Sequence, residues 1–96
     1  MAKATSFTKF TIKEGMMGEF EKQMTDGIRT FTALPGVLSM TMAKTGPNEI
    51  RSLVVYDKME SLELNSPKLK EIVGAAMPCI EEGGFERWTG EVFVEG

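Results

Sequence analysis

The sequence contains no histidine and one cysteine, Cys79. The absence of imidazole excludes Ser-His-Asp and Cys-His catalysis, histidine-based zinc sites and histidine-ligated haem. A lone cysteine cannot form a disulfide within the chain, which favours a cytoplasmic protein. Acid–base chemistry would therefore depend on carboxylates, lysines or the single tyrosine, Tyr56.

Neither sign of charge dominates, because 11 Lys and Arg residues stand against 14 Asp and Glu residues. No basic stripe is present, so we expect no nucleic-acid partner. No apolar run approaches the length of a membrane span or a signal peptide, so we expect no membrane partner. The 96 residues, 42% of them apolar, fit one globular domain over residues 1–96.

The first half of the chain predicts a strand, a helix and a hairpin. Residues 5–13 alternate as a strand, and residues 16–34 form an amphipathic helix whose apolar stripe is Met17, Phe20, Met24, Ile28 and Phe31. Pro35-Gly36 ends this helix. Residues 37–44 and 50–56 are the two strands of the hairpin, with Leu38, Met40 and Met42 expected on one face.

The second half predicts a further helix and a last strand. Asp57 stands three residues before Glu60, the spacing of a helix cap, and Ser66-Pro67 is expected to start the second helix. The apolar face of this helix is Leu69, Ile72, Val73, Ala76 and Ile80. Residues 85–94 form the last strand, in which Arg87, like Arg51 earlier, is expected at the solvent or at a rim.

This element order predicts an α+β fold, a ferredoxin-like βαββαβ unit with a four-stranded antiparallel sheet and both helices on one face. The third and fourth strands carry large apolar residues on both faces, such as Leu53 opposite Val54 and Trp88 opposite Phe93. An exposed face of this kind exceeds what monomers usually tolerate. We therefore expect a homodimer, with the sheet of one copy packed on the sheet of the other.

Two segments resemble the antibiotic biosynthesis monooxygenase-like family of dimeric α+β barrels. One runs from Leu53 to Pro67, where Tyr56-Asp57 stands in place of the family's Trp-Glu and the family's frequent histidine is absent. The other is the Pro-Gly opening of the second strand, Pro35 to Met42. The resemblance implies a dimeric barrel. It also implies an enzyme that oxidises phenols or quinols without metal, haem or flavin, so no cofactor is expected.

The family places Trp, Tyr, Asn and Arg side chains around a cavity, and on this basis Trp88, Tyr56 and Asn48 are the predicted catalytic residues. They would orient the substrate and stabilise negative charge. The alternative for Trp88 and Tyr56 is a packing role in the core or interface, and for Asn48 a role in the hairpin turn. No general base is assigned.

A pocket for a small apolar or aromatic ligand is expected from the side chains on the inward faces. The predicted substrate-binding residues are Met24, Met40, Met42, Phe20 and Arg51. Methionine fills irregular core space equally well, so the same residues are also consistent with simple packing. The second hypothesis for function is accordingly a non-catalytic small-molecule-binding dimeric barrel.

Overall fold

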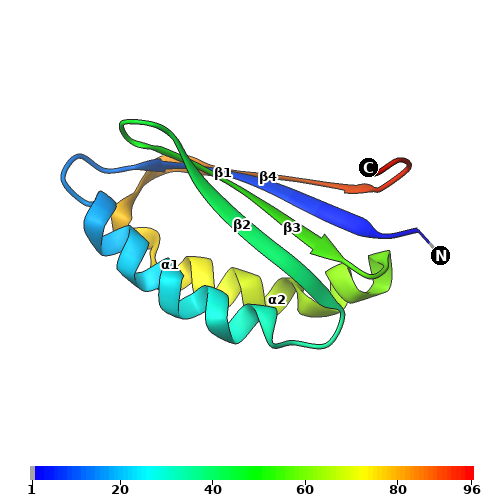
Figure 1. Cartoon of the computed structure of the whole chain (residues 1–96). Coiled ribbons are helices and arrows are strands. Elements are labelled where there is room, and N and C mark those ends of the chain that lie inside the picture. Colours follow the sequence, from blue (N-terminus) through cyan, green and yellow to red (C-terminus); the bar gives the residue numbers. More distant parts are fainter. Residues whose placement is uncertain (1) are drawn as a thin grey trace.

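The computed structural model describes residues 2–96, which fold as one sheet covered by two α-helices (Figure 1). The elements are β1 (Ala4–Ile12), α1 (Met17–Thr32), β2 (Val37–Gly46), β3 (Glu49–Tyr56), α2 (Met59–Ala75), a short 3-10 helix (Met77–Cys79) and β4 (Ile80–Glu91). The strand order is β2-β3-β1-β4, and every neighbouring pair is antiparallel. The predicted ferredoxin-like α+β fold is confirmed.

Both helices lie against one side of the sheet, which we call the inner face; the other side is the open face (Figure 1). Alternate residues of the central strand β1, among them Phe10 and Ile12, point to the inner face and are buried. The Phe10 ring lies 5.2 Å from that of Phe20 on α1 and 5.3 Å from that of Phe85 on β4. Burial of the Phe10 and Phe20 rings contributes about 1.5–3 kcal/mol each. Neither helix of residues 2–96 combines the length and apolar character that crossing a membrane requires.

The second helix is one continuous element, and the prediction that it starts at Ser66-Pro67 is wrong. Pro67 lies inside α2. Its ring removes the backbone N–H that would bond to the Glu63 carbonyl, and the hydrogen bond of the Ser66 hydroxyl to the Leu62 carbonyl at 2.6 Å does not replace it. Leu62 and Leu69, on either side of the proline, are both buried, so packing against the sheet holds the helix together across it.

Asp57 does not cap α2 as predicted, but ties its first turn to the preceding loop. The N-cap residue, Lys58, makes no side-chain capping bond, and the Asp57 carboxylate instead accepts a hydrogen bond from the Ser61 hydroxyl. Gly36, at φ +87°, accepts at its carbonyl from the Asp57 N–H at 2.9 Å. A Cβ at Gly36 would meet Ser61 Oγ, so only glycine fits both the conformation and the space.

Three predictions about the strands are also corrected, two of them by bulges. In β4, Ile80 pairs with Ile12 and Phe85 with Phe10, so residues 81–84 bulge out, and Ile80 belongs to the strand rather than to the helix. The strand ends at Glu91, which leaves Phe93 outside it and 96% exposed. In β2 a register shift between Val37 and Ser39 leaves Leu38 52% exposed, so it does not share the inner face with the methionines.

The two helices pack tightly against each other at Gly27 of α1. A Cβ added to Gly27 would lie 2.5 Å from Cγ2 of Ile72 on α2. We predict that Gly27→Ala lowers the free energy of unfolding by about 1–2 kcal/mol, because the overpacking cost exceeds the gain in helix propensity. Urea denaturation measures the change.

Gly18 is the matched control, since it lies in the same helix and, within the described residues, a Cβ built there meets no atom within 4 Å. Gly18→Ala should raise the free energy of unfolding by about 0.5–1 kcal/mol. Equal stabilisation by both substitutions would contradict a tight helix contact at Gly27.

Candidate functional site

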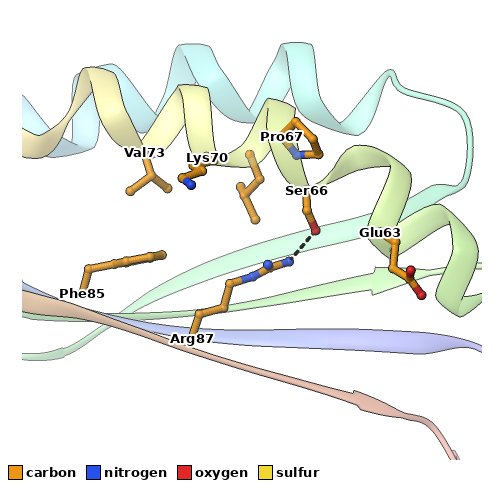
Figure 2. A pocket seen from close by; sticks show the side chains of 8 residues that line it. Glu63, Ser66, Pro67, Lys70, Val73, Phe85 and Arg87 are labelled. Carbon is orange, nitrogen blue, oxygen red and sulfur yellow. Dashed lines mark hydrogen bonds between the residues drawn. The ribbon is translucent and has the colours of Figure 1, made fainter.

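A cavity of about 580 Å³ lies between α2 and the edge strand β4 (Figure 2). We call it the α2/β4 cavity. It is lined by residues of α2 and of β4: Glu63, Ser66, Pro67, Leu69, Lys70, Val73, Phe85 and Arg87. Its volume falls in the range of small-molecule pockets, and its walls combine apolar groups with a few polar ones, the usual composition of such sites.

Arg87 supplies the polar contact that crosses this cavity. Its neighbours Glu86 and Trp88 point to the open face, so Arg87 shares the inner face with Phe85, and Figure 2 shows both side chains extending from β4 toward α2. Nη2 of Arg87 donates to the Ser66 hydroxyl at 3.2 Å. Its Nε is buried and has no hydrogen-bond partner within residues 2–96. Arg87 is therefore not simply solvent-facing, and of the two expected positions the structure agrees with the rim, where its partly buried side chain lines the cavity.

A row of buried hydroxyl groups continues from Arg87 across the inner face. Thr8 of β1 pairs with Arg87 on one side and with Ser52 of β3 on the other, and the Thr8 and Ser52 hydroxyls are hydrogen-bonded. The Ser6 hydroxyl and the Tyr56 phenol, also buried, lack partners within the described part of the chain. Each unpaired buried polar group costs about 1–3 kcal/mol. Polar residues at inward strand positions were the available sequence signal for this row.

A smaller cavity of about 330 Å³ lies between α1 and β2, and we call it the α1/β2 cavity. It brings together three of the predicted substrate-binding residues, Phe20, Met24 and Met42. Met40 packs partly buried against the core on the same face of β2. Arg51 lies on the open face with its side chain 61% exposed, apart from this group.

The three predicted catalytic residues occupy three separate places. Tyr56 is fully buried at the end of β3, where its ring meets that of Phe31 edge to face at 6.3 Å. Asn48 lies in the β2–β3 turn and donates to the Glu14 carboxylate at 3.4 Å. The two are separated along β3 by about 27 Å, at roughly 3.4 Å per residue. Trp88 is 53% exposed on the open face. Their shared catalytic role stays a prediction.

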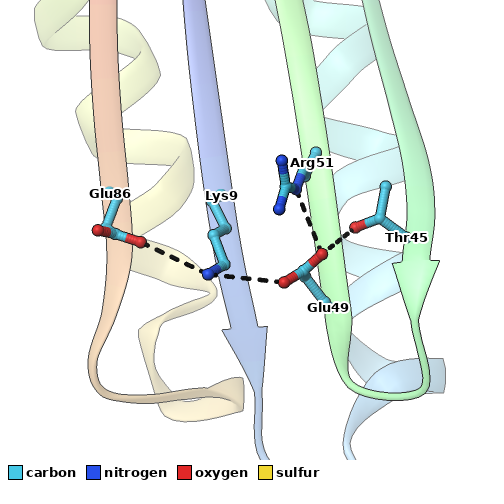
Figure 3. Close-up of polar contacts among 5 residues, drawn as sticks. All are labelled: Lys9, Thr45, Glu49, Arg51 and Glu86. Atoms are coloured by element: carbon cyan, nitrogen blue, oxygen red, sulfur yellow. Dashed lines mark hydrogen bonds and ion pairs between the residues drawn. The ribbon is translucent and has the colours of Figure 1, made fainter.

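The open face carries an apolar row flanked by a charged one. Phe7 pairs with Leu53 on one side and with Trp88 on the other, and the three side chains are 39–53% exposed. The charged row lies two residues farther along β1, at Lys9 (Figure 3). The Lys9 ammonium lies 3.6 Å from the Glu49 carboxylate and 3.8 Å from that of Glu86.

Glu49 is held in its charged form by this row. The Thr45 hydroxyl donates to Oε2 of Glu49 at 2.6 Å, and Nε of Arg51 donates to the same oxygen at 3.2 Å (Figure 3). The Thr45 hydrogen bond is the largest cause that lowers the pKa of Glu49 below its ordinary value of 4.5, with smaller contributions from Arg51 and Lys9.

Solved structures with the same fold cover almost the whole chain. SnoaB from Streptomyces nogalater, a cofactor-independent oxygenase, superposes with a TM-score of 0.82 at 16% identity, over 99% of this chain and 97% of SnoaB. A conserved protein from Methanosarcina mazei Go1 gives 0.83 at 17% identity, over 94% and 92% of the two chains. A Caulobacter crescentus CB15 protein, described as a candidate antibiotic biosynthesis monooxygenase, gives 0.82 at 21% identity, over 98% and 92%.

The chain thus has the fold of the antibiotic biosynthesis monooxygenase proteins, which confirms the resemblance seen in its two sequence segments. No protein-family model matches the sequence, and no curated protein sequence does. At these identities the likeness establishes the fold alone, so an argument about function has to start from the cavity and its residues.

Removal of the Thr45 hydroxyl should raise the pKa of Glu49. We predict that Thr45→Val moves it toward 4.5, measured by NMR titration of the side-chain carboxyl. Because the folded-state pKa lies below the unfolded one, the stabilisation from Glu49 is present above the unfolded pKa and is lost as the pH falls through the folded pKa. The variant should therefore begin to lose it at a higher pH.

Thr41→Val is the control, since Thr41 lies on the same strand, opposite Leu53 rather than Glu49. It should leave the Glu49 titration unchanged. An unaltered titration in Thr45→Val would show that Arg51 and Lys9 account for the lowered pKa without the hydroxyl.

Proposed function

We propose that this chain is a cofactor-independent monooxygenase-like enzyme that oxidises a small phenol or quinol in the α2/β4 cavity. The observation that carries the proposal is the Arg87 guanidinium held inside an apolar cavity of about 580 Å³. The fold shared with SnoaB, described as a cofactor-independent oxygenase, supports the same class of reaction. The phenol or quinol substrate rests on the motif resemblance and on the apolar cavity walls.

The proposed chemistry needs the substrate to become an anion that gives electrons to oxygen. For an anthrone-like phenol, one ring carbon loses two C–H bonds and gains a C=O bond. One atom of O₂ enters the product and the other leaves as water, so electrons balance without an external reductant. The phenolic proton passes to solvent or to a base that the proposal leaves unassigned.

The cavity offers what this chemistry asks of a protein. Leu69, Val73 and Phe85 provide apolar walls that exclude water from a flat ring. The Arg87 guanidinium provides hydrogen-bond donors and a positive charge for the oxygen on which negative charge develops. The Ser66 hydroxyl fixes the guanidinium by accepting from Nη2.

The second candidate is a non-catalytic barrel that binds a small apolar or aromatic molecule in the same cavity. The observation that favours it is the position of Glu63, the carboxylate among the lining residues, which is exposed to solvent. A cavity without a buried carboxylate can bind a ligand without removing its proton. Oxygen consumption separates the two candidates.

We also propose that two copies pair through their open faces, as expected from the sequence. The row of Leu53, Phe7 and Trp88 is an exposed apolar patch of the kind that marks an interface. The neighbouring charged groups carry both signs, because Lys9 lies near the Glu86 and Glu49 carboxylates and pairs across the strands with Arg51, so they can form the polar rim of such an interface. A cytoplasmic location stays a prediction from the sequence.

Oxygen uptake by the purified protein with reduced quinols and anthrone-like phenols tests the enzyme proposal. We expect saturable uptake that Val73→Phe lowers by about 10-fold or more, because the larger side chain fills the α2/β4 cavity. Val73 is buried and lines that cavity. A boiled-protein sample gives the background rate.

Ile28→Phe is the matched control, since Ile28 lines the α1/β2 cavity. It should leave uptake within about 2-fold of wild type, the range expected for a change outside the site. The reverse pattern would transfer the site to Phe20, Met24 and Met42. A flat trace with all substrates, combined with binding of the same phenols, would favour the non-catalytic barrel.

Trp88→Glu should weaken self-association. Placing a carboxylate in a desolvated apolar interface should raise the dimer Kd by about 30-fold or more, or about 2 kcal/mol. Analytical ultracentrifugation over a concentration series measures it. Leu64→Glu, at a 77% exposed position on α2, is the control and should leave the Kd unchanged. Equal effects, or a wild-type monomer at micromolar concentration, would contradict the open-face dimer.

A further inference from the structure

The two cavities have similar positions in the fold, but the basic residue at each cavity has a different kind of partner. Each cavity lies between a helix and an edge strand of the sheet. The first lies between α2 and β4, and the second lies between α1 and β2. Each edge strand carries one basic residue whose side chain contacts the neighbouring helix. Lys44 of β2 forms an ion pair with the Glu21 carboxylate of α1, whereas Arg87 of β4 meets the neutral Ser66 hydroxyl of α2.

The positive charge of Arg87 is therefore left without a counter-charge. Within residues 2–96, no carboxylate oxygen lies within 4.0 Å of its guanidinium, and the buried Nε has no acceptor. The other charged residues that line the cavity are Lys70 and Glu63, whose charges cancel. The lining residues therefore carry one net positive charge, that of Arg87. A cation surrounded by apolar walls interacts more strongly with a bound anion than the same cation does in water.

We propose that the α2/β4 cavity binds an aromatic carboxylate, so that the substrate of the proposed reaction is a phenol or quinol carrying a carboxylate group. The flat ring lies against Phe85 and Val73, and the carboxylate oxygens accept from the Arg87 guanidinium. A planar guanidinium matches a carboxylate with two parallel hydrogen bonds, which a neutral ligand cannot reproduce. Ser66 is a positioning residue, because it restrains Nη2 without being the charged group.

This inference rests on the proposed function only in assigning the ligand to this cavity, and not on any oxidation step. The probes are therefore two ligands, 2-naphthoate and its neutral analogue 2-naphthamide. Isothermal titration calorimetry on the full chain at pH 7.5 measures the affinity of the protein for each. We expect naphthoate to bind at least about 10-fold more tightly than naphthamide, because one charge-assisted contact contributes a difference of this size.

Arg87→Met should remove this preference. Affinity for naphthoate should fall about 10-fold, to the level of naphthamide, while affinity for naphthamide stays within about 2-fold. Arg51→Met removes a cation of the same type from the open face, and Lys44→Met removes the cation at the α1/β2 cavity. Both controls should keep the preference for naphthoate.

A measurement on the unaltered protein guards against a variant that fails to fold. The Nε–H resonance of Arg87, assigned by NMR, should shift on addition of naphthoate and remain in place with naphthamide. Equal affinity for the two probes, equal loss in Arg51→Met, or an unmoved Nε–H signal with naphthoate bound would each overturn the inference.

The proposed enzyme and the proposed ligand class can fail separately. Tight naphthoate binding without oxygen uptake from any phenol or quinol would reject the oxidation and keep the carboxylate site. Oxygen uptake from phenols or quinols, combined with equal affinity for naphthoate and naphthamide, would keep the oxidation and reject the carboxylate site.

Discussion

The alternation of side chains along β1 is the constraint on which the rest of the structure depends. This strand lies between β3 and β4, so the face to which each of its residues points is also the face to which its paired residues in β3 and β4 point. Inward positions carry Thr8 and Phe10, and outward positions carry Phe7 and Lys9. Because the period is two, a one-residue slip would exchange the core with the open face. The cavity residue Arg87 faces inward because it pairs with Thr8.

Patterns that repeat over many residues were readable from the sequence. The apolar stripe of α1 predicts a helix, and three of its members, Phe20, Met24 and Phe31, are buried in the structure. The turn at Pro35-Gly36 separates α1 from β2, the turn after β2 separates β2 from β3, and together these signals define the fold. Periodicity is a sum over a whole element, so one irregular residue does not hide it.

Features that depend on tertiary contact were not readable in this way. Ser66-Pro67 has the local chemistry of a helix start, yet packing of Leu62 and Leu69 carries α2 through it. The inward position of Arg87 could have been derived from its two-residue spacing to Phe85. Its partner Ser66, however, lies 21 residues away in the sequence and comes near only when α2 packs on β4. The candidate site is therefore a product of the assembled layers.

Neighbouring residues of β4 lie on opposite faces of the sheet, and this separates the proposed ligand site from the proposed self-association surface. Arg87 enters the α2/β4 cavity, whereas Trp88, the next residue, lies on the open face beside Phe7. A substitution at one position leaves the other's surroundings intact, since the sheet lies between them. Trp88 was predicted as catalytic because the family uses tryptophan near its cavity, but the period of a strand assigns this indole to the face opposite the helices. The guanidinium of Arg87 is then the polar group of β4 that a ligand in the cavity can reach.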